Sequence, residues 1–187
     1  LFHFNSFREN FNVRSMYNQA IKDLLPYDHK IGNTNLYISS DEKKEINEKL
    51  NIEKYFVLAP EAAWTQKQFP AQRYVGILNN IYKKFNLTPV LIGSSNGNIC
   101  KEIAKGYNNE IINISGKTSL RESLSVISNA LFVVGGDTGM IHAAEALSKH
   151  VVAIFGPTNK QTGGGLFRKL SEEIHAPNIW CKPCSIN

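Results

Sequence analysis

The sequence is poor in cysteine and has no long hydrophobic run. Its 187 residues include three cysteines, Cys100 and the pair Cys181 and Cys184 in the string CKPC, which are too few for a disulfide framework. A cytosolic setting is therefore the default expectation. Because no stretch of about 18 apolar residues occurs, no membrane-spanning helix is predicted. The opening string LFHFNSFREN has neither a Met nor the apolar segment of a signal peptide, so we interpret it as the cut end of something longer.

Two common nucleotide-binding motifs are also absent. No stretch reads G-x-x-x-x-G-K-[ST] or G-x-G-x-x-G, which argues against a P-loop kinase and a dinucleotide dehydrogenase. The net charge of +5 favours anionic ligands such as nucleotides or phosphosugars. The lysines are dispersed along the chain, so nucleic acid is not an expected partner.

A regular alternation of short apolar runs and amphipathic segments begins at Tyr55. Five strands are predicted, each followed or preceded by a helix of about ten to sixteen residues. This pattern is typical of an α/β protein with a Rossmann-like, doubly wound parallel sheet. The predicted strands are 55–60, 88–93, 110–114, 131–136 and 151–156.

Ligands of open parallel sheets bind beyond the carboxyl ends of the strands. Four loops are predicted at that edge, and all of them are rich in glycine or polar residues: 59–70, 93–98, 135–139 and 156–165. Their agreement indicates a binding site more strongly than any single loop does.

The loop GGDTG at 135–139 has a direct physical interpretation. Asp137 is predicted to be the N-cap of the next helix, so that Thr138 and Gly139 present free backbone N–H groups to a phosphate. His142 lies four residues after Thr138, and its side chain is expected to point back toward the same helix end. The alternative is an ordinary strand-to-helix connection with a packed or solvated histidine.

Two neighbouring loops and the CKPC pair offer further candidates. Lys67 precedes a helix that Pro70 helps to open, and it can neutralise a phosphate or remain a plain surface lysine. Thr158 belongs to the loop GPTNKQTGGG, which can equally be a linker. Cys181 and Cys184 have metal-like spacing but supply two ligands where structural zinc needs about four. A redox disulfide, free thiols or half of a truncated cluster are the alternatives.

These motifs, in this order, resemble the C-terminal half of glycosyltransferase family 9, the heptosyltransferases of lipopolysaccharide core synthesis. The resemblance covers about Tyr55 to Cys184 and rests on Lys67 with Phe69-Pro70, the Gly116-Lys117-Thr118 string, Asp137-Thr138-Gly139 with His142, and Gly156-Pro157-Thr158. It implies a GT-B enzyme of two Rossmann-like domains. Residues 55–187 would be the domain that binds the donor, an ADP-sugar. Residues 1–54 would be a remnant of the N-terminal domain with its connecting helix, predicted over 12–25.

The resemblance also implies roles for individual residues. Lys67 would contact the sugar or the diphosphate, and Thr158 would lie on a neighbouring loop. Asp137, Thr138 and Gly139 would line the sugar-diphosphate site with help from His142. Ser95 and Asn96 lie in the loop that approaches the ribose in relatives. The acid common in that loop of the family is not evident here.

The implied reaction is an inverting transfer of a sugar, heptose from ADP-heptose, to a lipid A-core acceptor, with no metal or cofactor required. The catalytic base and most of the acceptor site belong to the family's N-terminal domain, so this chain alone is expected to be inactive. The expected location is the cytoplasm, with peripheral association at the inner membrane left open. Two alternatives remain: a fragment that binds nucleotide-sugar without turnover, and a GT-B relative that glycosylates protein.

Overall fold

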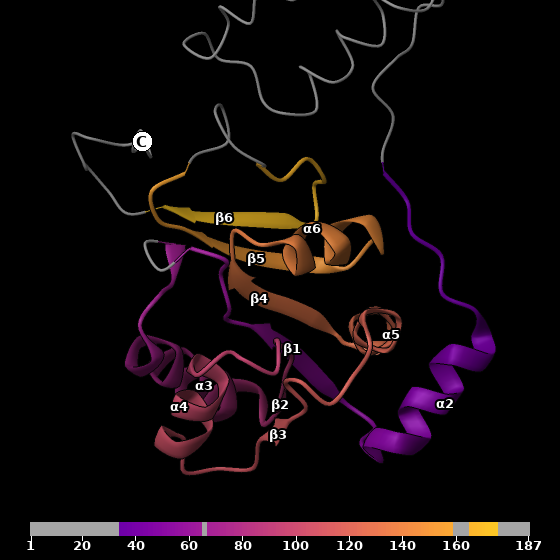
Figure 1. Cartoon of the computed structure of the whole chain (residues 1–187), viewed down its shortest axis with the longest axis horizontal. Helices are drawn as coiled ribbons and strands as arrows, with labels where there is room; N and C mark the ends of the chain where they lie inside the picture. The colour runs from indigo at the N-terminus through magenta and orange to yellow at the C-terminus, as the bar shows by residue number, and fades with distance from the viewer. Residues whose placement is uncertain (1–33, 65–66, 159–164, 176–187) are drawn as a thin grey trace, which may run out of the picture.

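The computed structural model describes residues 34–64, 67–158 and 165–175, which form a six-stranded, entirely parallel sheet in the order β3-β2-β1-β4-β5-β6 (Figure 1). The strands are β1 (Tyr55–Ala59), β2 (Thr88–Leu91), β3 (Ile112–Asn113), β4 (Phe132–Gly136), β5 (His150–Phe155) and β6 (Ser171–His175). The helices are α2 (Ser40–Leu50), α3 (Ala71–Phe85), α4 (Ile99–Gly106), α5 (Leu120–Asn129) and α6 (Gly139–Ala146). The predicted α/β, doubly wound fold is confirmed.

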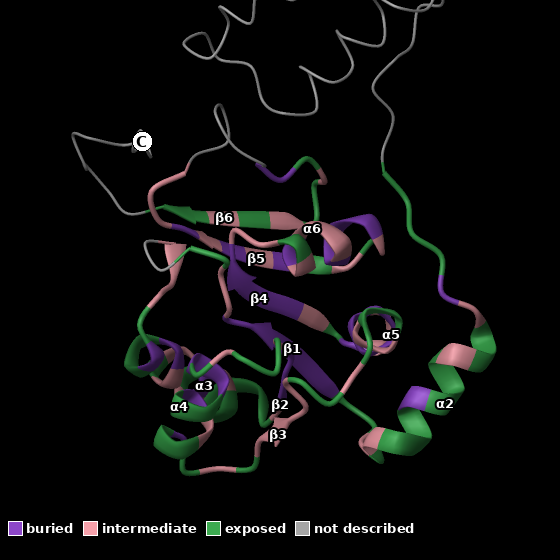
Figure 2. Cartoon of the chain, viewed as in Figure 1, coloured by how far each residue is buried: buried purple, intermediate pink, exposed green. Residues whose placement is uncertain are grey.

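Helices cover both faces of the sheet, and side chains of successive strand residues point to opposite faces. On β1, Tyr55 and Val57 pack with α2, α5 and α6, whereas Phe56 and Leu58 pack with α3 and α4. All five residues of β1 are buried, and Figure 2 shows β1 and most of β4 as the buried centre of the molecule. Burial on both faces explains why these strands are continuous apolar runs.

The five predicted strands are all present, but the sixth, β6, was not predicted. Its sequence SEEIH has little apolar character, because the strand lies at the edge of the sheet and leaves most of its residues partly or fully exposed. It pairs in parallel with β5 along its whole length. Two helices, α4 and α6, have eight residues each and are shorter than expected. The predicted helix at 12–25 lies outside the described residues.

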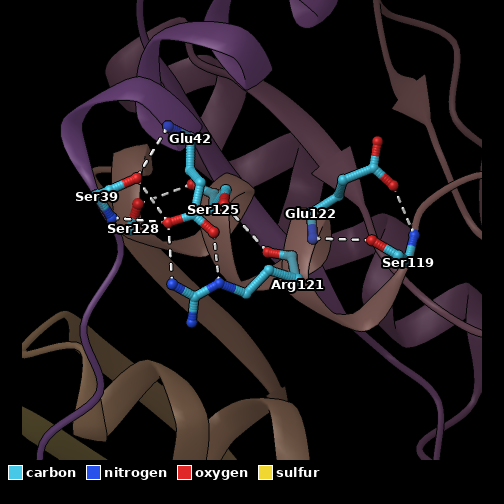
Figure 3. A network of polar contacts seen from close by, with 7 residues as sticks. All are labelled: Ser39, Glu42, Ser119, Arg121, Glu122, Ser125 and Ser128. Atoms are coloured by element: carbon cyan, nitrogen blue, oxygen red, sulfur yellow. Dashed lines mark hydrogen bonds and ion pairs between the residues drawn. The ribbon is translucent and has the colours of Figure 1, made fainter.

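Two helices of one layer, α2 and α5, are joined through their N-terminal caps (Figure 3). Ser39 and Glu42 form a capping box at the start of α2, and Ser119 and Glu122 form the equivalent box at the start of α5. Arg121 of α5 donates two hydrogen bonds to Glu42 of α2. In the other direction, Lys49 of α2 forms an ion pair of 2.6 Å with Glu122 of α5. Glu42 and Glu122 therefore each cap their own helix and also bind a side chain of the other helix.

The strand order places β1 beside β4, and this pair is the point where the direction of the crossovers reverses. The loops that leave β1 and β4 therefore diverge on opposite sides of the sheet and open a crevice at its carboxyl edge. That crevice is where a ligand is expected. Within the described part of the chain, no helix is long and apolar enough to cross a membrane.

Candidate functional site

A partly buried ion pair marks the carboxyl edge of β1 and β4. Lys67, from the loop after β1, donates a hydrogen bond of 2.8 Å from Nζ to Oδ2 of Asp137, which follows β4. The Asp137 side chain is 7% exposed and that of Lys67 is 21% exposed. The ammonium also lies 5.4 Å from the ring centroid of Trp64, within the range of a cation–π contact. The ion pair thus connects the two loops that diverge at the crevice.

Two more side chains converge on the Asp137 carboxylate. Thr158, after β5, donates from Oγ1 to Oδ2 at 2.7 Å. His142 of α6 lies with Nε2 3.2 Å from Oδ1. Four predicted site residues, Lys67, Asp137, His142 and Thr158, therefore form one cluster, although 91 positions separate the first from the last.

The surroundings of Asp137 set its ionisation. Burial by itself would raise the pKa of this carboxyl, but hydrogen bonds from His142, Lys67 and Thr158 outweigh it and hold the pKa well below its usual range. Asp137 is therefore a stable anion at neutral pH and a weak base. Its chemistry suits holding Lys67 and a hydroxyl in place rather than accepting a proton.

The prediction that Asp137 is the N-cap of α6 is wrong. The N-cap is Thr138, in an extended conformation, and its side chain makes no capping hydrogen bond. The carboxylate oxygens of Asp137 bind His142 of α6 and also Lys67 and Thr158 from other loops, and a local sequence pattern does not reveal the contacts with the other loops. Gly139 begins the helix and is exposed, and its amide and that of Met140 have no acceptor within the helix, whereas the Ile141 amide already donates to the Thr138 carbonyl at 3.1 Å.

Gly135 allows the backbones of β4 and β1 to approach closely at this point. A Cβ at Gly135 would overlap the carbonyl oxygen of Ala59 and press on the side chain of Ile141. Only glycine fits where the two central strands end and the crevice begins.

The predicted ribose-side residues lie on a separate loop. Ser95 and Asn96 are exposed in the turn after β2 and do not belong to the hydrogen-bonded cluster around Asp137. Gly116 is hydrogen-bonded to the start of this loop. Its backbone is left-handed, with φ 69°, and its N–H donates to the Gly93 carbonyl at 2.9 Å. The two sets of predicted residues thus occupy different parts of the same sheet edge.

One residue that the sequence interpretation missed connects these parts. Glu61, two residues beyond β1, accepts a hydrogen bond of 2.6 Å from the Ser94 amide through Oε2, while its Oε1 is buried without a partner among the described residues. The sequence could have identified Glu61, because it is an acidic residue in the 59–70 loop, which was predicted to lie at the carboxyl edge of the sheet. A cavity of about 250 Å³ lies beside it, lined by Ala59, Glu61, Ile92, Gly93, Ser94, Ser123, Thr138, Gly139 and Met140.

No metal site is evident in the described part of the chain, where no three His, Cys, Asp or Glu side chains are grouped to hold an ion. Cys181, Cys184 and the three glycines 163–165 fall partly or wholly outside the described residues, so the predictions made for CKPC stay predictions. Cys100 is a free, buried thiol, and burial raises its pKa to about 12.

Comparison with known proteins adds a family match. Residues 12–186 match the profile of glycosyltransferase family 9 (heptosyltransferase). Lipooligosaccharide heptosyltransferase 2 of Haemophilus influenzae is 40% identical over 50 residues, which are 27% of this chain and 14% of that protein.

Two solved structures share the fold. The structure of E. coli ADP-heptose lps heptosyltransferase II superposes with a TM-score of 0.71 at 22% identity, covering 79% of this chain and 47% of that one. A family 9 glycosyl transferase from Veillonella parvula gives a TM-score of 0.78 at 15% identity, covering 92% of this chain and 52% of the other. The chain spans about half the length of these two structures.

Proposed function

Because the chain belongs to glycosyltransferase family 9, the heptosyltransferase family, we propose that it forms the donor-binding half of an inverting GT-B glycosyltransferase that uses an ADP-sugar. The GT-B architecture is supported by the structures of a heptosyltransferase and of a family 9 glycosyl transferase, which match this chain over about half of their own length. The name of the E. coli relative supports ADP-heptose as the donor and lipopolysaccharide as the acceptor.

The observation that carries this proposal is the Lys67–Asp137 ion pair beside the open N-terminus of α6. The amides of Gly139 and Met140 at the start of α6 and the Lys67 ammonium together suit the negative charge of a diphosphate. That charge grows on the leaving ADP as the glycosidic bond breaks, and fixed donors stabilise it there without reorganisation. His142 and Thr158 hold Asp137, which in turn holds Lys67.

The catalytic base is proposed to come from the N-terminal domain of the family. Asp137 is unsuited to that role, since three hydrogen bonds keep its pKa low. In the reaction, the base removes the proton of an acceptor hydroxyl, whose oxygen attacks the anomeric carbon as the ADP oxygen leaves with the bonding electrons. We propose that the chain alone binds the donor without turnover, works in the cytoplasm, and meets its lipid A-core acceptor through the other domain.

Calorimetric titration with ADP, UDP and GDP tests this proposal. We expect ADP to bind, and Lys67→Ala to weaken its affinity about 10- to 100-fold, the range for a lost hydrogen bond to a charged group. Lys105→Ala, on the exposed surface of α4, is the matched control and is expected to bind ADP like the parent. Failure of all three nucleotides to bind at millimolar concentration would refute the donor-site proposal.

A further inference from the structure

The Tyr74 hydroxyl is a buried polar group outside the cluster around Asp137. Tyr74 lies near the start of α3, its side chain is fully buried, and its hydroxyl has no hydrogen-bond partner among the described residues. Phe69 contacts its ring edge to face, with the two ring centroids 5.2 Å apart. Burial raises the pKa of Tyr74 above its usual range, so the hydroxyl stays protonated. A buried hydroxyl without a partner costs free energy and therefore calls for an explanation.

The space beside Gly136, at the end of β4, is lined by oxygen atoms. Apart from its chain neighbours, the three nearest atoms to a Cβ built on Gly136 are the Lys67 carbonyl oxygen, the Tyr74 hydroxyl and the Ile154 carbonyl oxygen. They lie 3.8, 3.8 and 4.0 Å away, so a group as large as a methyl fits there without a clash. Gly136 and Tyr74 are both buried, which places this space inside the protein.

The three oxygens match the hydrogen-bonding capacity of one water molecule. A water can donate one hydrogen to each carbonyl and accept a third hydrogen bond from the Tyr74 hydroxyl. About three hydrogen bonds to groups that otherwise lack a partner are typical of a buried water. A carbonyl oxygen has two lone pairs, so Ile154 can bind a water as well as a neighbouring strand. An apolar group would leave the hydroxyl unpaired, and the two carbonyls would repel an anion.

The groups around this space belong to the segments that carry the cluster around Asp137. Lys67 provides the ammonium that binds Asp137, and Gly136 directly precedes that acid. Ile154 lies four positions before Thr158, which donates to the same carboxylate. A water bound here connects the backbones whose side chains meet at Asp137.

We propose that one buried water occupies this space and that Tyr74 is a positioning residue, which holds the backbone of Lys67 through that water. The side chain of Lys67 is fixed by its ion pair, and the water fixes its main chain to α3 and β5. A lysine held at both ends loses less freedom when it contacts a ligand, so it binds that ligand more tightly. The water site is independent of the proposed function, whereas its effect on ADP binding rests on it.

A crystal structure of the 187-residue chain, at a resolution that shows ordered water, tests the site directly. We expect an electron-density peak at about 2.6–3.2 Å from all three oxygens. Crystals soaked in a thallium salt separate water from a monovalent cation, because thallium gives an anomalous signal and water does not. The proposal is overturned by an anomalous peak, by the lack of any peak, or by a direct hydrogen bond from Tyr74 to either carbonyl.

Oxygen-17 magnetic relaxation dispersion counts the waters held inside the chain in solution. Gly136→Ala fills the space with a methyl group, and the backbone tolerates alanine there because φ at Gly136 is not positive. We expect this variant to hold one long-lived water fewer than the parent. Gly76→Ala on α3, where a Cβ meets nothing within 4 Å, is the matched control and should hold the same number as the parent. An unchanged count in folded Gly136→Ala would contradict the site.

Calorimetric titration with ADP tests whether Tyr74 acts through Lys67. Tyr74→Phe removes only the hydroxyl, and we expect it to weaken ADP binding about 3- to 10-fold, the range for one hydrogen bond. In the Lys67→Ala background the same substitution should have no further effect, since the ammonium that it positions is gone. Tyr82→Phe, which changes an exposed tyrosine of the same helix, is the matched control and should bind ADP like the parent.

The outcomes separate this inference from the proposed function. An equal loss of affinity in both backgrounds, or parent-like ADP binding by Tyr74→Phe, overturns the positioning role. Thermal unfolding of each variant checks that it is folded. A parent chain that binds no ADP overturns the proposed function and the positioning role with it, while the electron density and the water count still decide whether the buried water is present.

Discussion

At the scale of single residues, Asp137 organises the site because its carboxylate is the common partner of side chains from three other segments. Lys67 and Thr158 share Oδ2, and His142 lies against Oδ1. Each hydrogen bond to the ionised carboxylate is stronger than one between neutral groups. The anion therefore fixes the position of a cation that would otherwise be a flexible surface lysine.

This arrangement predicts a pH dependence of stability that Asp137→Asn removes. The pKa of Asp137 is lower in the folded chain than its ordinary value of 3.8. The extra stability is therefore fully present above that value, and it is lost as the pH falls below it toward the pKa of the folded state. We expect the parent to exceed the variant by about 2 kcal/mol in free energy of unfolding at pH 7. The difference should shrink at pH 3, measured by urea denaturation.

Comparing parent with variant cancels the contributions of other acids. Glu42 and Glu122 also have lowered pKa values, of about 2, because of hydrogen bonds from Arg121 and Lys49 respectively and from their capping serines. Their effect is the same in both proteins. A difference that stayed constant from pH 7 to pH 3 would contradict the assignment to Asp137.

At the scale of secondary-structure elements, the helix caps of α2 and α5 combine local and tertiary roles. The Ser119 hydroxyl oxygen accepts a hydrogen bond from the Glu122 amide, and the Glu122 carboxylate accepts one from the Ser119 amide. The same Glu122 binds Lys49 of α2. The cap is a property of the local sequence, whereas the ion pairs between the helices depend on the way that they pack.

Loss of a cap should therefore cost more than loss of an exposed ion pair. Ser119→Ala is expected to lower the free energy of unfolding by about 1 kcal/mol, because it leaves a backbone N–H at the helix start unpaired. Arg121→Ala should change it little, since the Arg121 side chain is 51% exposed and water screens its pairing with Glu42. Urea denaturation measures both. Ser128→Ala, inside α5, is the control for serine removal, and an equally large loss there would argue against the cap.

The contact of β1 with β4 gives a second prediction at this scale. Gly135→Ala introduces a methyl group against the carbonyl of Ala59, which is backbone and has little freedom to move. We expect a loss of about 1–3 kcal/mol in the free energy of unfolding, the usual cost of overpacking, together with weaker ADP binding. Gly76→Ala on α3 is the matched control and should be neutral or stabilising. A melting temperature of Gly135→Ala equal to that of the parent would contradict this prediction and show that β1 and β4 can move apart at little cost.

At the scale of the whole molecule, the buried acid Glu145 connects α6 to the segment that precedes the edge strand β6. Glu145 of α6 is 7% exposed, and its Oε1 accepts from the amides of Phe167 and Arg168. Arg168 in turn binds the backbone of Thr34 and the side chain of Asn35. The segment before β6 and the segment before α2 are therefore held at the same helix.

Removing this acid should loosen the β6 edge before the rest of the sheet. Glu145→Ala leaves two backbone amides without their charged acceptor, so we expect a loss of about 3 kcal/mol in the free energy of unfolding. Faster hydrogen exchange should be confined to β5 and β6. Glu102→Ala, on the exposed face of α4, is the control and should exchange like the parent. Uniformly faster exchange over the whole sheet would contradict a local role for Glu145.

The sequence by itself determined the fold class, and it predicted the four residues that the fold brings together around Asp137. Buried strands such as β1 and β4 are read as continuous apolar runs, and the loops after them carry Lys67 and Asp137 at the edge where parallel strands end. Strand β6 could not be found in this way, because an exposed edge strand has no apolar periodicity. The family resemblance given by these motifs agrees with the match over residues 12–186.

Only the tertiary structure decided the partners of the polar side chains. Local pattern made Asp137 a helix cap, but packing gives its oxygens to Lys67, His142 and Thr158, so that Thr138 becomes the cap. Glu61 reaches the Ser94 amide across 33 positions of sequence, and no spacing rule covers such a contact. Apolar burial and backbone hydrogen bonding repeat along the chain and can be read from it, whereas the meeting of separate loops depends on how the strands are ordered in the sheet.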